Sequence, residues 1–150
     1  MGFEIKDIPA ITFLSATVRL ADVPEIAPYA QKTVPALFAK SKELGLEIAG
    51  PEVFIYHFLE KGMDVRIGVP VKAARGEPAP FAFHTTQPVK CFSTVYAGSM
   101  KTIGTGWDKL TYEGKARKLA LTNECREVYT LWKDFDSADN RTELQRVMKA

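Results

Sequence analysis

The sequence predicts an α+β fold, and three observations lead to that prediction. Several short runs alternate between apolar and polar side chains, which is typical of strands with one buried face. Two longer stretches carry apolar residues at three-and-four spacing, which is typical of amphipathic helices. The order strand, helix, hairpin occurs twice along the chain, which indicates a duplicated supersecondary unit.

Length and composition bound the number of domains. The chain has 150 residues, of which 46% are hydrophobic and 25% are charged. That is enough for one sizeable core and too little for two of ordinary size. We therefore expect a single domain over residues 1–150, built from pseudo-repeats at about residues 1–73 and 80–150.

The first repeat begins with strand-forming residues over 3–20, interrupted at Pro9. Asp22, followed by a proline and a glutamate, predicts a helix start with an acidic cap and a first-turn proline. The helix is expected to run to about Leu44, with a kink or break at Pro35. Two alternating runs then predict a hairpin, and a segment rich in Ala, Gly and Pro is expected to connect the repeats; these are Glu52–Leu59, Met63–Val71 and Ala73–Pro80.

The second repeat is expected to follow the same order. It begins with a strand region over Phe81–Tyr96 and a helix over Met100–Leu119. It then continues with a strand over 123–132, a polar turn at Asp136–Asn140 and a short strand at Thr142–Val147. The second helix contains three glycines, each of which costs about 1 kcal/mol relative to alanine in a helix interior. They indicate either close backbone approach or flexibility, or a helix that frays or starts late.

Glu127 stands out within its predicted strand. Alternation places it on one face with Cys125 and Tyr129, a face that should be apolar, whereas Arg126 and its neighbours lie on a face expected to be solvated. An unpaired buried charge is too costly to keep without a use. Glu127 should therefore have an internal cationic or hydrogen-bonding partner, or receive one from a ligand.

Composition also excludes several classes of function. Lys and Arg total 20 against 18 Asp and Glu, and no face carries a basic tract, so direct nucleic-acid binding is not expected. The N-terminus has no secretory pattern and no run approaches the ~18 apolar residues of a membrane span, so we expect a cytoplasmic protein without a membrane partner. Cys91 and Cys125 lack metal-ligand spacing and are expected to be buried, reduced and structural.

No cofactor or metal is expected. Haem binding through His57 or His84 is the alternative to consider. His57 shares its strand face with Ile55 and lies opposite Phe54 and Tyr56, so it should point away from the site proposed below. A satisfied or exposed histidine is the preferred interpretation, and an absent Soret band would test it.

The chain resembles the GyrI-like domains, which include effector-binding domains of bacterial multidrug-responsive transcription activators. The resemblance spans nearly the whole chain and rests on four motifs in order: Gly50-Pro51 before Ile55-Tyr56-His57, Asp64 to Val71, Tyr96-Ala97-Gly98, and Glu127-Val128-Tyr129. It implies two strand-helix-strand-strand units forming one antiparallel sheet, with both helices on one face and a ligand pocket between the units. It also implies that Glu127 is the central carboxylate of that pocket.

Two departures from the family pattern accompany the resemblance. Gly98-Ser99-Met100 stands where the family often has Gly-Pro-Tyr, so an aromatic commonly found near the pocket is missing. The last strand ends in Arg146-Val147-Met148, where a proline-containing pair is usual.

The leading functional hypothesis is a stand-alone binder of hydrophobic, often cationic small molecules, which would sense or sequester a drug or toxin. Aromatic side chains would supply area and cation–π contacts, and Glu127 the countercharge. When the two repeats are aligned with an offset of about 73 residues, Glu127 corresponds to Phe54. Only the second repeat therefore carries an acid at this position. The predicted ligand-binding residues are Phe54, Tyr56, Trp107, Tyr112, Glu127 and Tyr129.

Two alternatives remain open. Some GyrI-like proteins resemble hydrolases of reactive cyclopropane compounds. In that reading Glu127 would act as general base, and Tyr129 or Tyr56 would donate a hydrogen bond to the developing oxyanion. The resemblance also extends to gyrase inhibitors, so gyrase or a regulator is a possible protein partner, although no surface residue argues for one. Turnover separates an enzyme from a binder.

Overall fold

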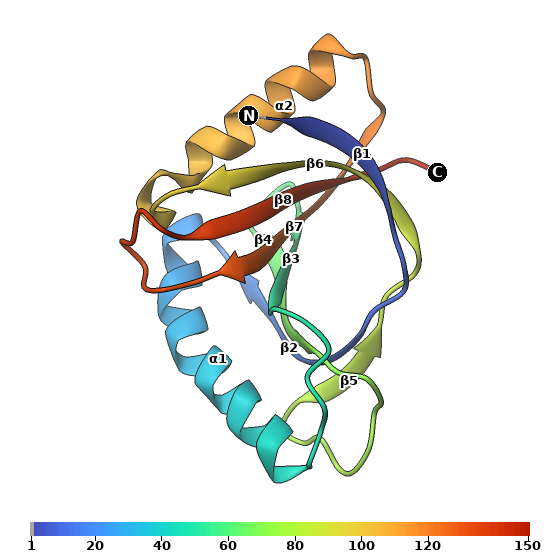
Figure 1. The fold of residues 1–150 in the computed structure, drawn as a ribbon, viewed down its shortest axis with the longest axis vertical. Helices are drawn as coiled ribbons and strands as arrows, with labels where there is room; N and C mark the ends of the chain where they lie inside the picture. The colour runs from blue at the N-terminus through green and yellow to red at the C-terminus, as the bar shows by residue number, and fades with distance from the viewer. Residues whose placement is uncertain (1) are drawn as a thin grey trace. The chain divides into compact units, whose positions relative to one another are not determined.

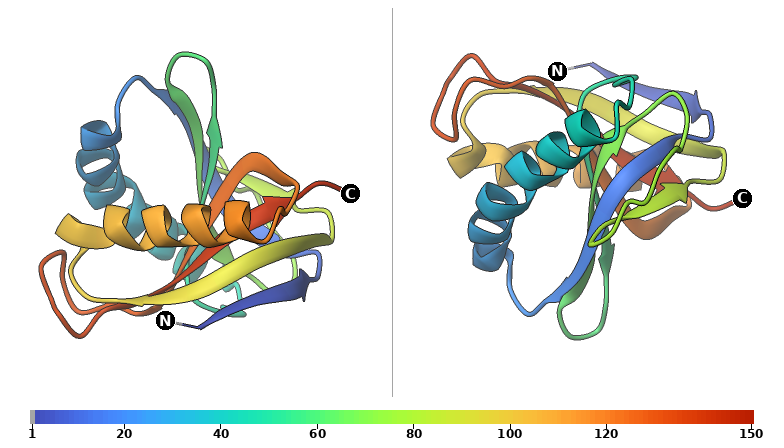
Figure 2. Two further views of the ribbon diagram at one scale, coloured as in Figure 1. Left: turned by 90° about the horizontal axis from the view of Figure 1, so that it is seen from above. Right: turned by 90° about the horizontal axis from the view of Figure 1, so that it is seen from below.

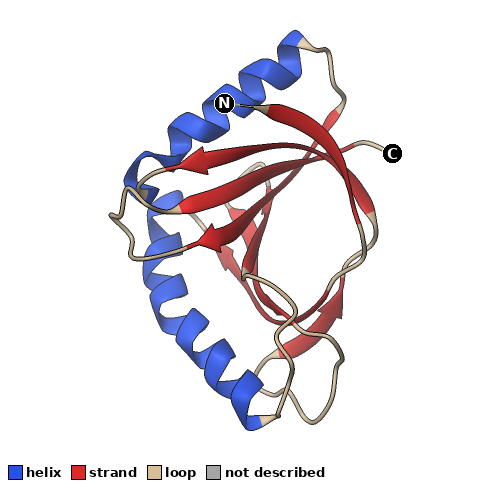
Figure 3. Ribbon diagram, in the orientation of Figure 1, coloured by secondary structure: helices blue, strands red, loops and turns tan. Residues whose placement is uncertain are grey.

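The computed structural model describes residues 2–150, and the chain divides into two compact units. The N-terminal unit comprises Pro9–Pro88, and the C-terminal unit comprises Val89–Ala150 together with the residues up to Ile8. Eight strands and two α-helices make up the described chain, and the strand pairs within each unit are antiparallel (Figures 1 and 3). The predicted α+β class is confirmed.

The N-terminal unit carries four strands in the order β3-β4-β2-β5, and α1 packs on β2 and β4. Its core contains Leu14, Leu37 and Ile67, none of which is exposed. Its elements are β2 (Thr12–Leu20), the short helix η1 (Val23–Glu25), α1 (Ile26–Glu43), β3 (Val53–Phe58), β4 (Met63–Pro70) and β5 (Ala82–Thr85).

The ends of the first helix follow the sequence prediction. The Glu25 carboxylate accepts hydrogen bonds from the backbone N–H groups of Ala21 and Asp22, at 2.7 and 3.0 Å, so it satisfies donors that the start of a helix leaves free. Gly45, just past the end of α1, has φ +65°, the left-handed conformation that a glycine stop provides. The helix continues through Pro35, so the expected break does not occur.

The predicted hairpin of β3 and β4 is confirmed, and the predicted strand region over Phe81–Tyr96 forms two strands with a break between them. The structure divides that region into β5, which pairs with β2, and β6 (Val89–Ala97), which belongs to the C-terminal unit. The break falls at Thr86–Pro88, where the proline has no N–H to donate to a strand pair and the Thr86 Oγ1 accepts from the Ile11 N–H at 3.0 Å.

The C-terminal unit has the strand order β1-β6-β8-β7, and α2 contacts β6 and β8 (Figure 2). The first strand of the chain pairs with β6, so it joins the unit formed by the second half. The compact units thus differ from the sequence bounds of the pseudo-repeats, and the duplication itself stays a prediction. The remaining elements are β1 (Phe3–Ile8), η2 (Met100–Thr102), α2 (Ile103–Ala116), β7 (Leu121–Leu131) and β8 (Arg141–Met148).

The core of the C-terminal unit explains two of the three helix glycines. Phe92, Tyr96, Leu110 and Leu144 form a buried cluster between α2 and the strands. A Cβ at position 106 would lie 2.8 Å from the Tyr96 ring, and one at position 114 would lie 2.9 Å from the Leu121 side chain, whereas position 104 faces open space. Close backbone approach therefore accounts for Gly106 and Gly114, and α2 is continuous.

Candidate functional site

The site begins with the alternation of β7. Cys125, Glu127 and Tyr129 share one face of this strand, and each is no more than 7% exposed, while Leu131 at the end of the strand is 46% exposed. The Trp107 Nε1–H of α2 donates a hydrogen bond of 2.7 Å to the Glu127 Oε2. The carboxylate is thus directed toward the helix of its own unit, as the strand alternation predicts.

Both carboxylate oxygens of Glu127 accept hydrogen bonds from aromatic side chains. The Tyr129 hydroxyl donates to Oε1 at 2.6 Å, on the opposite oxygen from the one that Trp107 contacts. Hydrogen bonds to an ionised acceptor are short and strong, and these two fix the orientation of the carboxylate. Because both donors are neutral, neither removes the formal negative charge. We call Trp107, Glu127 and Tyr129 the Glu127 cluster.

The opposite face of β7 is not the solvated face that the sequence predicts. Arg126 is only 3% exposed, and its Nε donates to the Glu124 Oε2 at 2.7 Å. Gln145 lies directly across from it on β8 and is 5% exposed. Arg126 and its cross-strand neighbour Gln145 are therefore buried, whereas Thr130 further along the same face is exposed.

Trp132 extends the Glu127 cluster outward, and the sequence analysis did not select it. Its ring packs edge-on against that of Tyr129, with centroids 5.7 Å apart and an interplanar angle of 80°. Trp132 is 44% exposed, whereas Tyr129 is 7% exposed. Its position directly after the Glu127 strand was the available signal, since an aromatic just past a site strand can lie at the edge of the site.

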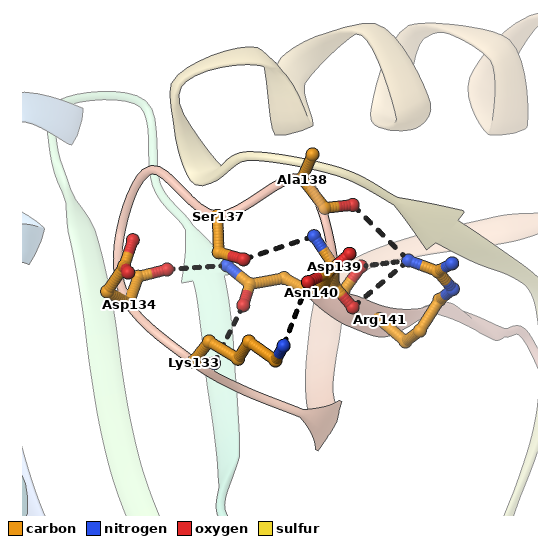
Figure 4. A network of polar contacts seen from close by, with 7 residues as sticks. All are labelled: Lys133, Asp134, Ser137, Ala138, Asp139, Asn140 and Arg141. Atoms are coloured by element: carbon orange, nitrogen blue, oxygen red, sulfur yellow. Dashed lines mark hydrogen bonds and ion pairs between the residues drawn. The ribbon is translucent and has the colours of Figure 1, made fainter.

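A polar network holds the loop that follows Trp132 (Figure 4). Asn140 is fully buried, its Nδ2 donates to the Asp134 carbonyl at 2.7 Å, and its Oδ1 accepts from the Lys133 N–H at 2.9 Å. Lys133 also pairs with Asp139, and the Arg141 guanidinium donates to carbonyls of the same loop, including that of Asp139 at 3.1 Å. The predicted polar turn is thus an ordered loop.

The other predicted site residues are Tyr112 on α2 and Phe54 and Tyr56 on β3. Tyr112 is 76% exposed, and its position five residues after Trp107 turns it to a different side of α2. Phe54 and Tyr56 are each 5% exposed on β3 of the N-terminal unit, with ring centroids 6.3 Å apart. A role in ligand binding stays a prediction for all three. His57 is exposed, one of the two states expected of it.

The two cysteines behave as structural residues. Both are buried, and burial raises the pKa of the Cys91 and Cys125 thiols to about 11. A thiol in that state is a poor nucleophile near neutral pH, since the thiolate is the reactive form. Between residues 2 and 150, no three His, Cys, Asp or Glu side chains gather as a metal site. Neither helix has the length and apolar character needed to span a membrane.

Comparison with known proteins identifies the fold. No protein-family model matches the sequence, and no curated protein matches it significantly. The solved EcmrR C-terminal domain is similar to this chain, with a TM-score of 0.81, 22% sequence identity, and coverage of 99% of this chain and 98% of that one. In an EcmrR–DNA complex the corresponding TM-score is 0.82 at 23% identity over 99% of this chain, which spans 58% of the EcmrR chain.

Two further structures share the fold. SAV2435 bound to tetraphenylphosphonium has a TM-score of 0.72 at 12% identity, covering 100% of this chain and 95% of that chain. A hydrolase encoded by lin2189 from Listeria innocua has a TM-score of 0.68 at 12% identity, covering 98% of this chain and 91% of that chain. The chain therefore has a GyrI-like fold, as the sequence resemblance predicts.

Proposed function

We propose that this chain binds hydrophobic, cationic small molecules, with Glu127 as the countercharge, and so senses or sequesters a drug or toxin. The observation that carries the proposal is a carboxylate, 5% exposed, oriented by hydrogen bonds from an indole N–H and a phenol O–H. The same two side chains present aromatic surface beside the charge. This combination suits a ligand that is both apolar and positively charged.

Desolvation of the charge is the main cost of binding a lipophilic cation. A lipophilic cation buries its apolar groups favourably but leaves water with an uncompensated charge, and a preoriented carboxylate offsets that cost without further reorganisation. Aromatic faces add about 0.5–2 kcal/mol for a cation near a ring. Trp107 and Tyr129 are both held by Glu127, so their surfaces and the charge lie in one place.

The comparisons support this proposal through ligand chemistry. SAV2435, which shares the fold, was solved with tetraphenylphosphonium, a cation of the proposed class. EcmrR was solved in complex with DNA, and this chain spans only part of its length. We propose ligand binding for this chain, and its balance of 20 basic against 18 acidic residues gives no reason to propose direct contact with nucleic acid. A partner protein, such as gyrase or a regulator, stays a prediction.

The first test is direct binding of tetraphenylphosphonium to the purified chain by isothermal titration calorimetry, with thermal unfolding as a second readout. We expect saturable binding. A ligand at a hundred times its dissociation constant should stabilise the folded state by about 2.7 kcal/mol. Neutral triphenylphosphine oxide serves as the comparison ligand and should bind more weakly. Absence of both heat and a thermal shift with tetraphenylphosphonium would overturn the proposal.

A hydrolase is the second candidate function, favoured by the contact of 2.6 Å between the Tyr129 hydroxyl and the Glu127 carboxylate. A carboxylate can accept a proton from an attacking water, and the hydrogen bond from the Tyr129 hydroxyl would orient the carboxylate for that step. The Listeria innocua structure named a hydrolase shares the fold. Incubation with a reactive cyclopropane compound followed by product analysis tests this candidate, because a binder returns its ligand unchanged.

A further inference from the structure

We infer that Trp132 forms an outer aromatic wall of the Glu127 site and selects for cations that carry aromatic rings. This inference rests on the proposed function. It adds to the proposed site a residue outside the predicted set and a preference among ligands, and its basis is the packing of Trp132 on Tyr129.

Contacts run without interruption from the exposed indole to the buried charge. Trp132 packs edge-on against Tyr129 at 5.7 Å, and the Tyr129 hydroxyl donates to Glu127 at 2.6 Å. Exposure falls along the same path, from 44% at Trp132 to 7% at Tyr129 and 5% at Glu127. One tyrosine side chain therefore separates an aromatic surface open to solvent from the carboxylate. A cation with aryl substituents can span that distance.

The backbone next to the exposed indole is held in place by its loop. Buried Asn140 bonds the backbone of Lys133, the residue next to Trp132, and the Gly98 N–H donates to the Asn140 carbonyl at 3.0 Å. The loop is also fixed to the start of η2, because the Met100 N–H donates to the Phe135 carbonyl at 3.0 Å. A loop that is already ordered loses less conformational entropy when a ligand binds beside it.

The chemistry of Trp132 sets the ligand class. An indole stacks well on other aromatic rings, edge-on or offset. Tetrabutylammonium can use the charge of Glu127, but its butyl chains offer no ring to stack and hold the charged nitrogen away from the indole face. An aryl cation gains from both. We therefore expect Trp132 to contribute to the affinity for tetraphenylphosphonium and not to that for tetrabutylammonium.

The test measures both cations by calorimetry on the parent, Trp132→Ala and Trp132→Phe. We expect Trp132→Ala to weaken tetraphenylphosphonium binding at least fivefold and to change tetrabutylammonium binding less than twofold. Trp132→Phe should lie between parent and alanine variant for the aryl cation. Val95→Ala is the matched control, because Val95 is 53% exposed on the face of β6 opposite Tyr96, and it should bind both cations as the parent does.

A second measurement reports on Trp132 itself. The difference in fluorescence between the parent and Trp132→Phe isolates Trp132 from Trp107, and acrylamide quenching of this component should fall when tetraphenylphosphonium saturates the site. Unchanged quenching together with parent-like affinity in Trp132→Ala would overturn the inference. Equal weakening of both cations with a lowered melting temperature would also overturn it, since that pattern marks a structural role.

The inference and the proposed function fail in different ways. If the parent binds tetraphenylphosphonium and Glu127→Gln weakens it, but Trp132→Ala does not, only the inference is wrong. If the parent binds neither cation, the proposed function is wrong and the inference falls with it.

Discussion

Replacing Glu127 with glutamine removes the charge of the proposed site and keeps its shape. The hydrogen bonds that join Glu127 to Trp107 and Tyr129 can both survive in the variant. The amide oxygen can accept from the Trp107 indole N–H, now at 2.7 Å from the carboxylate, and the amide nitrogen can donate to the Tyr129 hydroxyl, which accepts as readily as it donates. Glu127→Gln should therefore fold normally.

The expected loss of affinity follows from Coulomb's law. A cation held about 5 Å from a carboxylate interacts with it by about 3 kcal/mol at an effective dielectric constant of about 20. The amide dipole retains part of this attraction. We therefore expect the dissociation constant for tetraphenylphosphonium to rise at least tenfold, which corresponds to a loss of about 1.4 kcal/mol in binding free energy. The affinity for neutral triphenylphosphine oxide should stay the same. The free energy of unfolding should hold or rise, because a carboxylate that is 5% exposed loses its charge.

Calorimetry on Glu127→Gln and on a matched surface variant decides the question. Glu113→Gln removes the same charge from α2, where Glu113 pairs with Arg117 at 2.9 Å, so it measures the long-range effect of net charge alone. We expect less than a twofold change there. Equal weakening in both variants, or parent-like affinity in Glu127→Gln, would refute the role of Glu127 as countercharge. Loss of turnover with unchanged binding would instead favour the hydrolase.

Three further predictions concern stability and reactivity. Asn140→Ala removes both hydrogen bonds of a fully buried amide, and urea unfolding should show a loss of about 2–3 kcal/mol. Gly106→Ala should destabilise by about 1–3 kcal/mol, because the new Cβ would lie 2.8 Å from an aromatic ring, whereas Gly104→Ala faces open space and should stabilise by about 0.5–1 kcal/mol; equal effects of the two would contradict the packing. Burial raises the pKa of the Cys91 and Cys125 thiols from 9.0 to about 11, so the folded state favours the protonated forms. The stabilisation of the folded state that each protonated thiol provides is complete below pH 9. It is lost as the pH rises through 11, which lowers the free energy of unfolding by about 2–3 kcal/mol per thiol. Both thiols should resist iodoacetamide at pH 8 until the chain unfolds, and rapid labelling of the native protein would contradict the burial.

Local features of the fold could be predicted because neighbouring residues determine them. The alternation in β7 correctly placed Glu127 and Tyr129 on one side, since a strand alternates its side chains whatever it pairs with. The cap at Glu25 and the glycine stop at Gly45 were also predictable, because both satisfy groups within a few residues of the helix end. Each of these features is specified within a short stretch of chain.

Pairing between distant segments could not be predicted in the same way. The first strand pairs with β6, about ninety residues later, and no local pattern distinguishes that partner from a nearer strand. The burial of Arg126 was missed for a related reason, because its cross-strand neighbour Gln145 comes from a strand that begins ten residues after the end of β7. Tyr112 was expected beside Trp107, but the turn of the helix leaves it 76% exposed.

The sequence by itself determined that a carboxylate would lie on the helix-facing side of a strand, among aromatic residues. Only the tertiary structure decided which aromatic residues contact it. Trp107 reaches Glu127 because α2 packs across the strands of its unit, and Trp132 joins the site because an ordered loop holds it against Tyr129. The physical reason is that alternation orients a side chain relative to its own backbone, whereas a contact also requires a second segment, which packing brings from elsewhere in the chain.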